Sequence, residues 1–439
     1  MDSKRAAATE IVRRLRSEGF AAYLVGGCVR DMLMGRAPRD YDVTTGATPD
    51  EVLRLFPDAL TVGAQFGVII VPHEAGNVEV ATFRSDGLYA DGRHPREVRY
   101  GRTPQEDVER RDFTINGLLY DPLSDQVLDY VGGQADIRAR RLRTIGDPVA
   151  RLSEDRLRML RAVRFAARFA FRLDPAALEA IRELAPQIRS VSAERVRDEI
   201  VKILTEGPAR AGFELLDQTG LLAEVLPEIK RLQGVEQPPE FHPEGDVWIH
   251  TLMMLEGLRQ PTPTLALGVL LHDVGKPPTF SIRERIRFDN HVEVGASMAR
   301  EICARLRMSA RETERIVELV RDHLRFKDFP RMKRSTQLRF LRMEGFEEHL
   351  ELHRLDCLSS HRDLTNYELA RKMLEETPEE EIKPAPLLRG DDLIAHGYAP
   401  GPAFKIILQT VEDAQLEGRI HNNAQALRLV EEQFPVHRQ

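Results

Sequence analysis

The hydrophobic pattern changes character about one third of the way along the chain. Up to about residue 144, short apolar runs are broken by Gly and Asp turns, which is typical of strands in a mixed sheet. The predicted strands cover residues 23–25, 68–71, 78–83 and 126–130. From about residue 148 onward, apolar residues recur at helical spacing. The sequence therefore predicts an α+β chain, with a mixed α/β first part and a mostly helical remainder.

Two stretches rich in breakers divide the helical part. Residues 234–245 contain Gly and Pro, residues 375–386 are acidic and contain Pro, and both read as linkers. A chain of 439 residues is also too long for one core, since single cores rarely exceed about 250–300 residues. We therefore predict four domains, at residues 1–147, 148–235, 236–382 and 383–439.

Composition excludes several classes of protein. The chain is 42% hydrophobic and 30% charged, which is typical of a globular protein, and no apolar run approaches the roughly 20 residues that span a bilayer. The first 20 residues lack the apolar core of a signal peptide. The 3 cysteines form no CxxC pair, which favours a reducing cytoplasm. The net charge of −7 does not exclude a polyanionic partner, because arginine is concentrated in residues 138–172.

A pair of glycines follows the first predicted strand. Gly26 and Gly27 stand between that strand and a short helical run that contains Arg30. Glycines at such a turn let backbone amides approach a phosphate group closely. On its own the pair is equally typical of a tight turn.

Two aspartates follow closely on this turn. Asp40 and Asp42 alternate in a predicted strand, so both carboxylates should lie on one face. Mg²⁺ satisfies such a pair together with substrate phosphates, and two such ions can assist both the attacking and the leaving oxygen. Glu79, on a later strand, is either a third carboxylate of the site or a surface charge.

Further candidates follow in the chain. Residues 85–99 read as a mobile loop beside the site. The segment after it carries groups suited to triphosphate and ribose hydroxyls, namely Arg110, Arg111, Asp112 and Asn116.

Asp155 and Arg158 suggest a way of reading bases without a template. Three residues apart on a predicted helix, they should share a face. Cytosine and adenine both present an amino donor beside a ring-nitrogen acceptor, which a carboxylate beside a guanidinium complements. Uracil and guanine reverse this pattern. The alternative is that Asp155 and Arg158 form an ordinary ion pair within the helix. Arg161, Arg164 and Arg168 on the same helix either contact backbone phosphates or form a solvated basic face.

These motifs, in this order, closely resemble the class II tRNA nucleotidyltransferase and poly(A) polymerase family. The resemblance implies a polymerase-β-like head in residues 1–147 and a helical neck in residues 148–235. It also implies that Asp40 and Asp42 hold catalytic Mg²⁺, and that residues 192–199 brace the base-reading helix. The implied nucleotide-binding residues are Gly26, Gly27, Arg30, Arg111, Asp112, Asn116, Asp155, Arg158 and Arg161.

A second constellation lies in residues 236–382. Its histidines and aspartates supply mixed imidazole and carboxylate ligands, which suit a divalent transition metal with open water positions. The order His250, His272-Asp273, His291, His323, Asp356 resembles the HD phosphohydrolase superfamily. The resemblance implies His250, His272, Asp273 and Asp356 as metal ligands, with His291 and His323 serving a second metal. Hydrolysis of RNA-terminal or cyclic phosphates is the hypothesis, and a purely helical scaffold is the alternative.

The function that follows is addition of CCA to the 3′ end of tRNA from CTP and ATP. In this reaction the tRNA 3′ hydroxyl attacks the α-phosphate, and residues 383–439 either grip the tRNA body or serve only a structural role. The resemblance also implies that the loop at residues 91–95 takes part in the switch from C to A, and because the loop motif is intact it favours full CCA addition over CC-only, A-only or poly(A) addition. Alternatives from other classes are a phosphohydrolase whose head merely binds nucleotide, and an RNA-binding scaffold.

Overall fold

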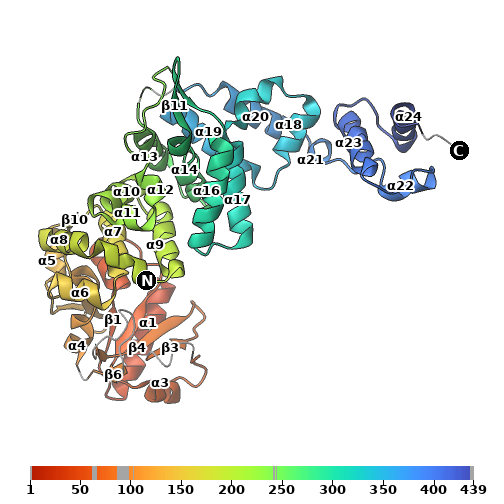
Figure 1. Ribbon diagram of the computed structural model, residues 1–439. Helices are drawn as coiled ribbons and strands as arrows, with labels where there is room; N and C mark the ends of the chain where they lie inside the picture. The colour runs from red at the N-terminus through yellow and green to blue at the C-terminus, as the bar shows by residue number, and fades with distance from the viewer. Residues whose placement is uncertain are drawn as a thin grey trace. The chain divides into compact units, whose positions relative to one another are not determined.

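The computed structural model describes residues 2–61, 67–86, 98–101, 103–240, 243 and 245–435. The chain forms two compact units. The first contains residues 1–230 and 305–308, and the second contains residues 231–304 and 309–439. Figure 1 labels their elements.

A six-stranded mixed sheet forms the centre of the first unit. Its order is β3-β4-β2-β1-β7-β8, in which β2 and β4 are parallel and all other neighbours are antiparallel. All four predicted strands are confirmed, with ends that differ by at most one residue. The strands are β1 (Ala22–Val25), β2 (Asp42–Thr45), β3 (Val68–Val71), β4 (Val78–Thr82), β7 (Leu118–Asp121) and β8 (Gln126–Asp129).

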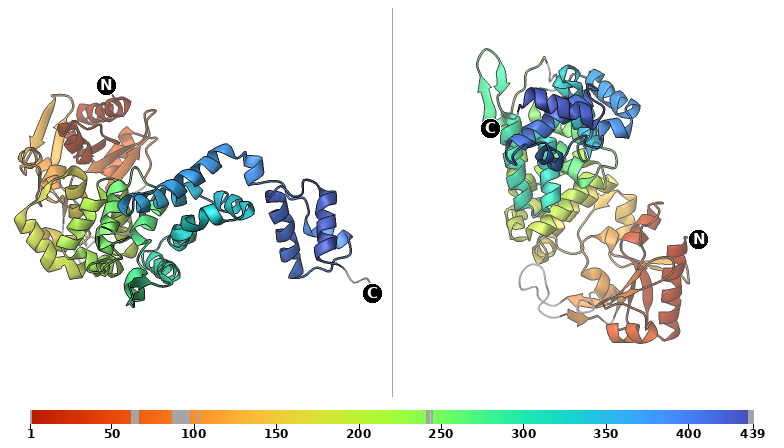
Figure 2. Two further views of the ribbon diagram at one scale, coloured as in Figure 1. Left: turned by 90° about the horizontal axis from the view of Figure 1, so that it is seen from above. Right: turned by 90° about the vertical axis from the view of Figure 1, so that its right-hand side faces the viewer.

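The two faces of this sheet differ in character. Helices α1 (Ser3–Ser17) and α3 (Pro49–Leu55) cover one face, where they bury apolar side chains such as Val12 and Leu15 (Figures 1 and 2). Val43 and Val80 point into this core. Because side chains alternate along a strand, the residues just before them, Asp42 and Glu79, point to the other face. The sheet thus directs two carboxylates away from its main core.

Short elements complete this part of the unit. They are α2 (Gly27–Leu33), α4 (Pro104–Glu109), the 3-10 helix η2 (Thr114–Asn116) and α5 (Gly133–Arg138). The segment expected to be a loop, residues 85–99, has paired strands at its ends, β5 (Arg84–Asp86) and β6 (Val98–Tyr100). Residues 87–97, including the loop motif at 91–95, lie outside the described residues.

Helices follow from residue 148, as predicted. After this point β10 (Arg172–Leu173) is the only strand among the described residues of the first unit, and it pairs with β9 (Arg141–Leu142), which precedes the helices. The helices are α6 (Pro148–Glu154), α7 (Arg158–Phe169), α8 (Pro175–Leu184), the 3-10 helix η3 (Ala185–Ser190), α9 (Ala193–Thr205), α10 (Ala209–Gln218), α11 (Leu221–Val225) and α12 (Pro227–Lys230).

Helix α7 is fixed to its neighbours by buried ion pairs as well as by apolar packing. Arg164 donates to Glu199 on α9 at 2.6 Å, and their side chains are only 7% and 3% exposed. Arg168 pairs with Glu206 at 2.8 Å. The predicted bracing role of residues 192–199 is therefore confirmed. Of the two alternatives left open for Arg164, a phosphate contact or a solvated basic face, neither fits its guanidinium, which is enclosed between two helices.

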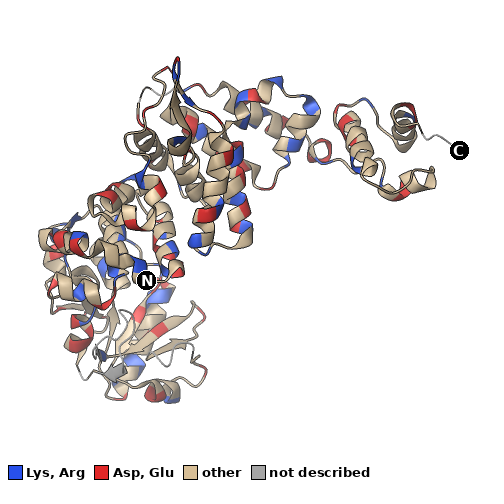
Figure 3. Cartoon of the chain, in the orientation of Figure 1, with Lys and Arg blue, Asp and Glu red and all other residues tan. Residues whose placement is uncertain are grey.

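The second unit is a helical body with one hairpin and a helical tail. Charges of both signs are interspersed on the helices of both units (Figure 3). The helices are α13 (Val247–Gly257), α14 (Pro263–Leu271), α15 (Lys276–Thr279), α16 (His291–Arg305), α17 (Ala310–Asp322), η4 (His323–Arg331), α18 (Arg334–Leu341), α19 (Phe346–Ser359), α20 (Thr365–Glu376), α21 (Glu379–Ile382), α22 (Gly390–Ala395), α23 (Ala403–Leu416) and α24 (Asn423–Gln433).

The sequence reading missed two features here. Strands β11 (Phe280–Ile282) and β12 (Ile286–Phe288) form an antiparallel hairpin within the helical part. The alternation of apolar and charged residues over 280–288 was the signal for it. The expected linker at residues 375–386 contains helix α21, whose Ile382 is buried in an apolar cluster with Phe329 and Leu338.

The tail has its own small apolar cluster, which includes Leu393, Val411 and Ala426. Ion pairs join α23 to α18, with Glu412 accepting from Arg339 at 2.9 Å and from Arg342 at 2.6 Å. Among the described residues, no helix has both the length and the apolar character to cross a bilayer.

The buried pair on α7 yields the first testable outcome. Replacing Glu199 by Ala should lower the free energy of unfolding by about 3 kcal/mol, because it leaves the buried Arg164 guanidinium with only the longer, 3.6 Å contact to Glu206. Urea unfolding measures the loss.

The matched control is Glu214→Ala, whose 49% exposed side chain pairs with Arg210 at 2.9 Å. Its loss should stay below about 0.5 kcal/mol. Equal losses in the two variants would contradict the role given to the buried pair.

Candidate active sites

The glycine turn of the first unit is conformationally specific. Gly26 has φ +77°, a left-handed conformation that favours glycine. A Cβ atom at this position would lie 3.3 Å from Nη1 of Arg111, and one on Gly27 would lie 3.5 Å from Nη2 of Arg30. The turn therefore lies beside two guanidinium groups, an arrangement suited to phosphate.

Two carboxylates meet beside this turn. Asp42 begins β2 and lies next to Glu79 on the parallel strand β4. Burial, followed by repulsion from Glu79, raises the pKa of Asp42 to about 6, and the nearby Arg111 opposes this rise. Carboxylates held together in this way fit a hard divalent cation, which would relieve their repulsion.

Asp40 is placed differently from the prediction. It precedes β2 instead of lying in it, and its 73% exposed side chain accepts from Lys4 Nζ at 2.9 Å. The paired strand thus begins two residues later than predicted, at Asp42, but Tyr41 and Val43 both lie in the core, as expected if Asp40 and Asp42 alternate with them. Asp40 is nevertheless close enough to add to the repulsion felt by Asp42.

A hydrogen-bonded relay links the turn to the neck helix. Arg30 donates to Asn116 Oδ1 at 2.6 Å, and Asn116 Nδ2 donates to Asp112 Oδ1 at 3.0 Å. Asp112 in turn accepts from Arg161 on α7 at 2.7 Å. Burial alone would raise the pKa of Asp112, but Arg161 and Asn116 lower it to about 2. The relay keeps this carboxylate ionised and fixes α7 against the turn.

Asp155 and Arg158 lie at a break between helices. Helix α6 ends at Glu154 and α7 begins at Arg158, so the expectation of one continuous helix is wrong. Asp155 interrupts it because its side chain accepts from the backbone N–H of Leu157.

The two side chains are held separately. Asp155 also accepts from Arg195 on α9 at 2.7 Å, and Arg158 donates to Glu154 at 2.6 Å. Among the described residues, no ion pair joins Asp155 to Arg158. The ordinary intrahelical pair that the sequence left open is therefore absent here.

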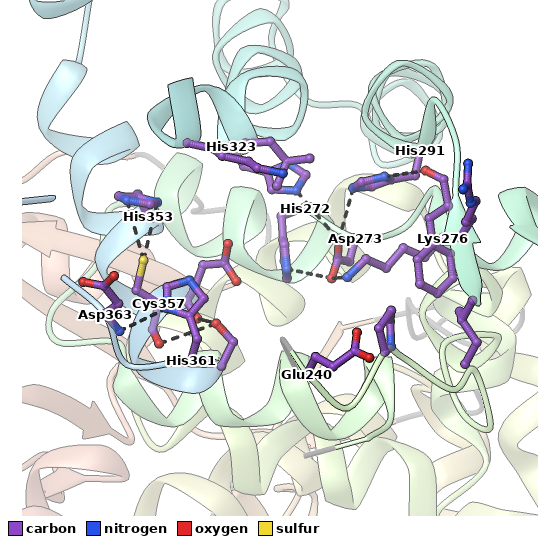
Figure 4. A pocket seen from close by; sticks show the side chains of 18 of the residues that line it. Glu240, His272, Asp273, Lys276, His291, His323, His353, Cys357, His361 and Asp363 are labelled. Atoms are coloured by element: carbon purple, nitrogen blue, oxygen red, sulfur yellow. Dashed lines mark hydrogen bonds and ion pairs between the residues drawn. The ribbon is translucent and has the colours of Figure 1, made fainter. Parts of the chain in front are cut away.

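The second unit gathers histidines and aspartates from five segments. Figure 4 shows His272, His291 and His323 around Asp273. Ligand atoms of two sets lie within 4.8 Å of one another, His250 with His272 and Asp273, and Asp273 with His291 and His323. Asp356, on α19, lies 3.2 Å from Nε2 of His250. All six residues proposed from sequence thus come together.

The imidazoles are oriented for metal binding. Nδ1 of His272, His291 and His323 each lies 2.7–2.9 Å from a backbone carbonyl, of Val269, Phe288 and Val320 respectively. Each Nδ1 therefore carries the proton and donates it, so that Nε2 is left as the acceptor that a metal requires.

Electrostatics favour the same protonation state. Burial, together with repulsion from His272, lowers the pKa of His323 to about 3, and burial also lowers that of His291. Burial alone would raise the pKa of Asp273, but the attraction of His272 and Lys276 holds it well below its usual range. Neutral imidazoles beside an ionised carboxylate fit a divalent transition metal.

This cluster opens into a cavity of about 770 Å³. Lys276 lies at its inner end, where its Nζ contacts Asp273 Oδ2 at 2.6 Å and Gln237 Oε1 at 2.6 Å. A cation beside a metal-type cluster suits an anionic substrate. The sequence analysis assigned no role to Lys276.

Comparisons with known protein families match three successive segments of the chain. Residues 22–143 match the family described as "Poly A polymerase head domain". Residues 170–232 match "Probable RNA and SrmB- binding site of polymerase A", and residues 247–359 match "HD domain".

Individual relatives point the same way. The chain is 44% identical over 211 residues to a CCA-adding enzyme of Geobacillus thermodenitrificans, covering 48% of this chain and 52% of the relative. It is 37% identical over 235 residues to poly(A) polymerase I of Haemophilus influenzae, covering 51% of each. These matches span about half the length of the curated relatives.

A solved structure extends the likeness to nearly the whole chain. The Bacillus stearothermophilus CCA-adding enzyme, solved in complex with CTP, covers 98% of each chain with a TM-score of 0.76 at 27% identity. The fold and the sites define a polymerase-type nucleotidyltransferase head joined to an HD domain. The chain resembles the class II tRNA nucleotidyltransferase and poly(A) polymerase family in these three matched segments and in the fold of nearly its whole length.

Close backbone packing in the HD motif gives a second testable outcome. A Cβ on Gly275 would lie 2.1 Å from the carbonyl oxygen of His291 and 2.6 Å from the N atom of Gly295. Gly275→Ala should therefore push α16 away, lower stability by about 2 kcal/mol, and reduce bound Mn²⁺ measured by equilibrium dialysis.

Gly401→Ala is the control, because a Cβ there meets nothing within 4 Å. It should bind Mn²⁺ as the wild type does. Unchanged Mn²⁺ binding by Gly275→Ala would contradict this steric argument.

Proposed function

We propose that the chain adds CCA to the 3′ ends of tRNA, using CTP and ATP and no nucleic-acid template. The observation that carries the proposal is the meeting of Asp42 and Glu79 beside the Gly26 turn and Arg111. The CTP complex of the solved relative supports the choice of substrate class. The names of the curated relatives support tRNA as the acceptor.

In the proposed reaction, the tRNA 3′ hydroxyl attacks the α-phosphate of the nucleotide and pyrophosphate leaves. Asp40 and Asp42 would hold Mg²⁺, which supplies charge stabilisation for the attacking and leaving oxygens when bound. Gly26, Gly27, Arg30 and Arg111 would orient the triphosphate. The Arg30 side chain is only 5% exposed. It would therefore act on the triphosphate indirectly, through the backbone of the Gly26–Gly27 turn.

Base selection is assigned to the break before α7. Asp155 would accept from the exocyclic amino group of cytosine or adenine, while Arg158 would donate to the ring nitrogen. Their separate anchors, Arg195 and Glu154, would hold both side chains without pairing them to each other. Asp112, Asn116 and Arg161 would position this edge relative to the ribose.

The remaining assignments follow from the same family. Residues 1–147 would be the head, 148–235 the neck, 236–382 the HD domain and 383–439 a tail that binds tRNA. The matched ranges 22–143, 170–232 and 247–359 fall within the first three of these parts. The widely spaced, buried cysteines support a cytoplasmic location.

The proposal predicts that Asp42→Ala lowers the rate at which CTP and ATP are incorporated into tRNA that lacks CCA by about a thousandfold or more. Its midpoint of thermal unfolding should not fall, because removal of Asp42 relieves the repulsion from Glu79. Radiolabel incorporation and circular dichroism measure the two effects.

Asp58→Ala, which removes an exposed acid outside the site, is the matched control and should retain full activity. Incorporation by Asp42→Ala at the wild-type rate would overturn the assignment of the site.

A second activity is favoured by the histidine cluster of the HD domain. We propose that His250, His272, Asp273 and Asp356 hold a divalent transition metal, with His291 and His323 serving a second. Such a metal lowers the pKa of its bound water and so supports hydrolysis of RNA-terminal phosphate esters. Lys276 would neutralise charge on the reacting phosphate.

This second proposal predicts separable activities. Asp273→Asn should abolish phosphate release from a terminally phosphorylated RNA and leave nucleotide incorporation within about twofold, because the residue lies outside the first unit. Phosphate release that persists in this variant would assign the hydrolysis to another site.

A further inference from the structure

The β11–β12 hairpin joins two segments that carry metal-type ligands. It begins directly after α15, which follows His272 and Asp273, and it returns to His291 at the start of α16. Ser281 pairs with Arg287, and Ile282 pairs with Ile286 across the two strands. The hairpin projects beyond the helices of its unit, while its base lies at the cavity (Figures 1 and 2).

Phe288 anchors the base of the hairpin to the histidine cluster. Its ring packs on Phe280 with centroids 5.9 Å apart, and Lys276 Nζ lies 5.3 Å from the ring centroid. Its carbonyl accepts from Nδ1 of His291 at 2.9 Å. The neighbouring residue, Arg287, is therefore held at a defined place on the cavity wall.

Three cations that line the cavity have no protein partner among the described residues. They are Arg285 and Arg287 on the hairpin and Lys327 on η4, and within that part of the chain none of them forms a side-chain hydrogen bond or an ion pair. The Nε atom of Arg287 is buried without a hydrogen-bond partner. Leaving such a donor unpaired costs about 1–3 kcal/mol. By contrast, Arg315 in the same unit is held by Glu348 at 2.9 Å.

The cavity is larger than one phosphate group requires. Its volume of about 770 Å³ lies in the range of sites for nucleotide-sized ligands. A second cavity of about 580 Å³ shares Glu240, Ser360 and His361 with it and also contacts Arg362. The two cavities therefore adjoin each other at these shared residues.

We propose that Arg285, Arg287 and Lys327 bind a non-reacting phosphate of the substrate, which makes the HD-domain site selective for the end of an RNA chain over a free mononucleotide. This inference rests on the proposed phosphohydrolase activity. In that reaction water forms the new P–O bond, the ester P–O bond breaks, and the ribose oxygen leaves with a proton. The three cations take no part in bond breaking, so they should affect only substrates that carry a second phosphate.

The test uses two substrates with the same terminal phosphate, adenosine 3′-monophosphate and the dinucleotide ApAp. Phosphate release by the full chain with Mn²⁺ is measured for the wild type and for Arg285→Gln/Arg287→Gln. The double variant should lose about tenfold in kcat/KM for ApAp, as expected for lost charge-assisted hydrogen bonds, and stay within about twofold for the monophosphate. Lys327→Gln should show a smaller loss of the same kind.

Arg283→Gln is the matched control, because Arg283 lies in the same hairpin turn but does not line the cavity. It should behave as the wild type with both substrates. Equal losses for both substrates in the double variant, or no loss for either, would overturn the proposal.

A separate outcome distinguishes failure of the hydrolase proposal. If the wild type releases phosphate from neither compound, calorimetric titration compares ApAp binding by the double variant and by Arg283→Gln. If ApAp binds at least about fivefold more weakly to the double variant but not to Arg283→Gln, the proposed phosphate site stands. Loss of one charge-assisted hydrogen bond should weaken binding by at least this factor. Equal binding by the two variants rejects it.

Discussion

The ion pairs of helix α7 are the interaction on which the first unit depends. Arg158, Arg161, Arg164 and Arg168 each pair with a carboxylate, from Glu154, Asp112, Glu199 and Glu206 respectively. These partners come from the preceding helix, from the head and from α9. One helix therefore orients both the glycine turn and the break before α7, where we propose that bases are read. Because breaking a buried ion pair lowers stability strongly, these pairs hold α7 in a fixed position beside the site.

The two candidate sites differ in chemistry because they differ in ligands. Asp42 and Glu79 offer only carboxylate oxygens beside a phosphate-type turn, which suits Mg²⁺ and a triphosphate. The cluster in the second unit offers imidazoles together with the carboxylates of Asp273 and Asp356, which suits a transition metal and an activated water. The ligands of the two sites thus support the proposal that one serves bond formation and the other hydrolysis.

Much of this arrangement was predictable from sequence. The alternation of apolar residues predicted the strands of the sheet, and the order of the histidines and aspartates predicted a cluster that the fold does assemble. The departures have local causes. Asp155 accepts from a backbone N–H and so ends a helix that periodicity alone would continue. Arg164 looked exposed because its burial depends on Glu199, 35 residues away in the chain.

Residue pairs that depend on tertiary contacts were also missed. Gln237 holds Lys276 across 39 residues, and the β11–β12 hairpin places Arg287 on the cavity wall. Periodicity over a window of residues carries no information about such distant pairs. Only the alternation over residues 280–288 could have indicated the hairpin.

The most direct measurement follows labelled CTP and ATP, separately and together with Mg²⁺, into tRNA that ends before the CCA, after C, and after CC. The account predicts that the first acceptor gains two C and one A, that the second gains one C and one A, and that the third gains only one A. Addition of C alone, of a single A to every acceptor, or of a long A tract would contradict CCA addition, and no incorporation would contradict the nucleotidyltransferase assignment itself.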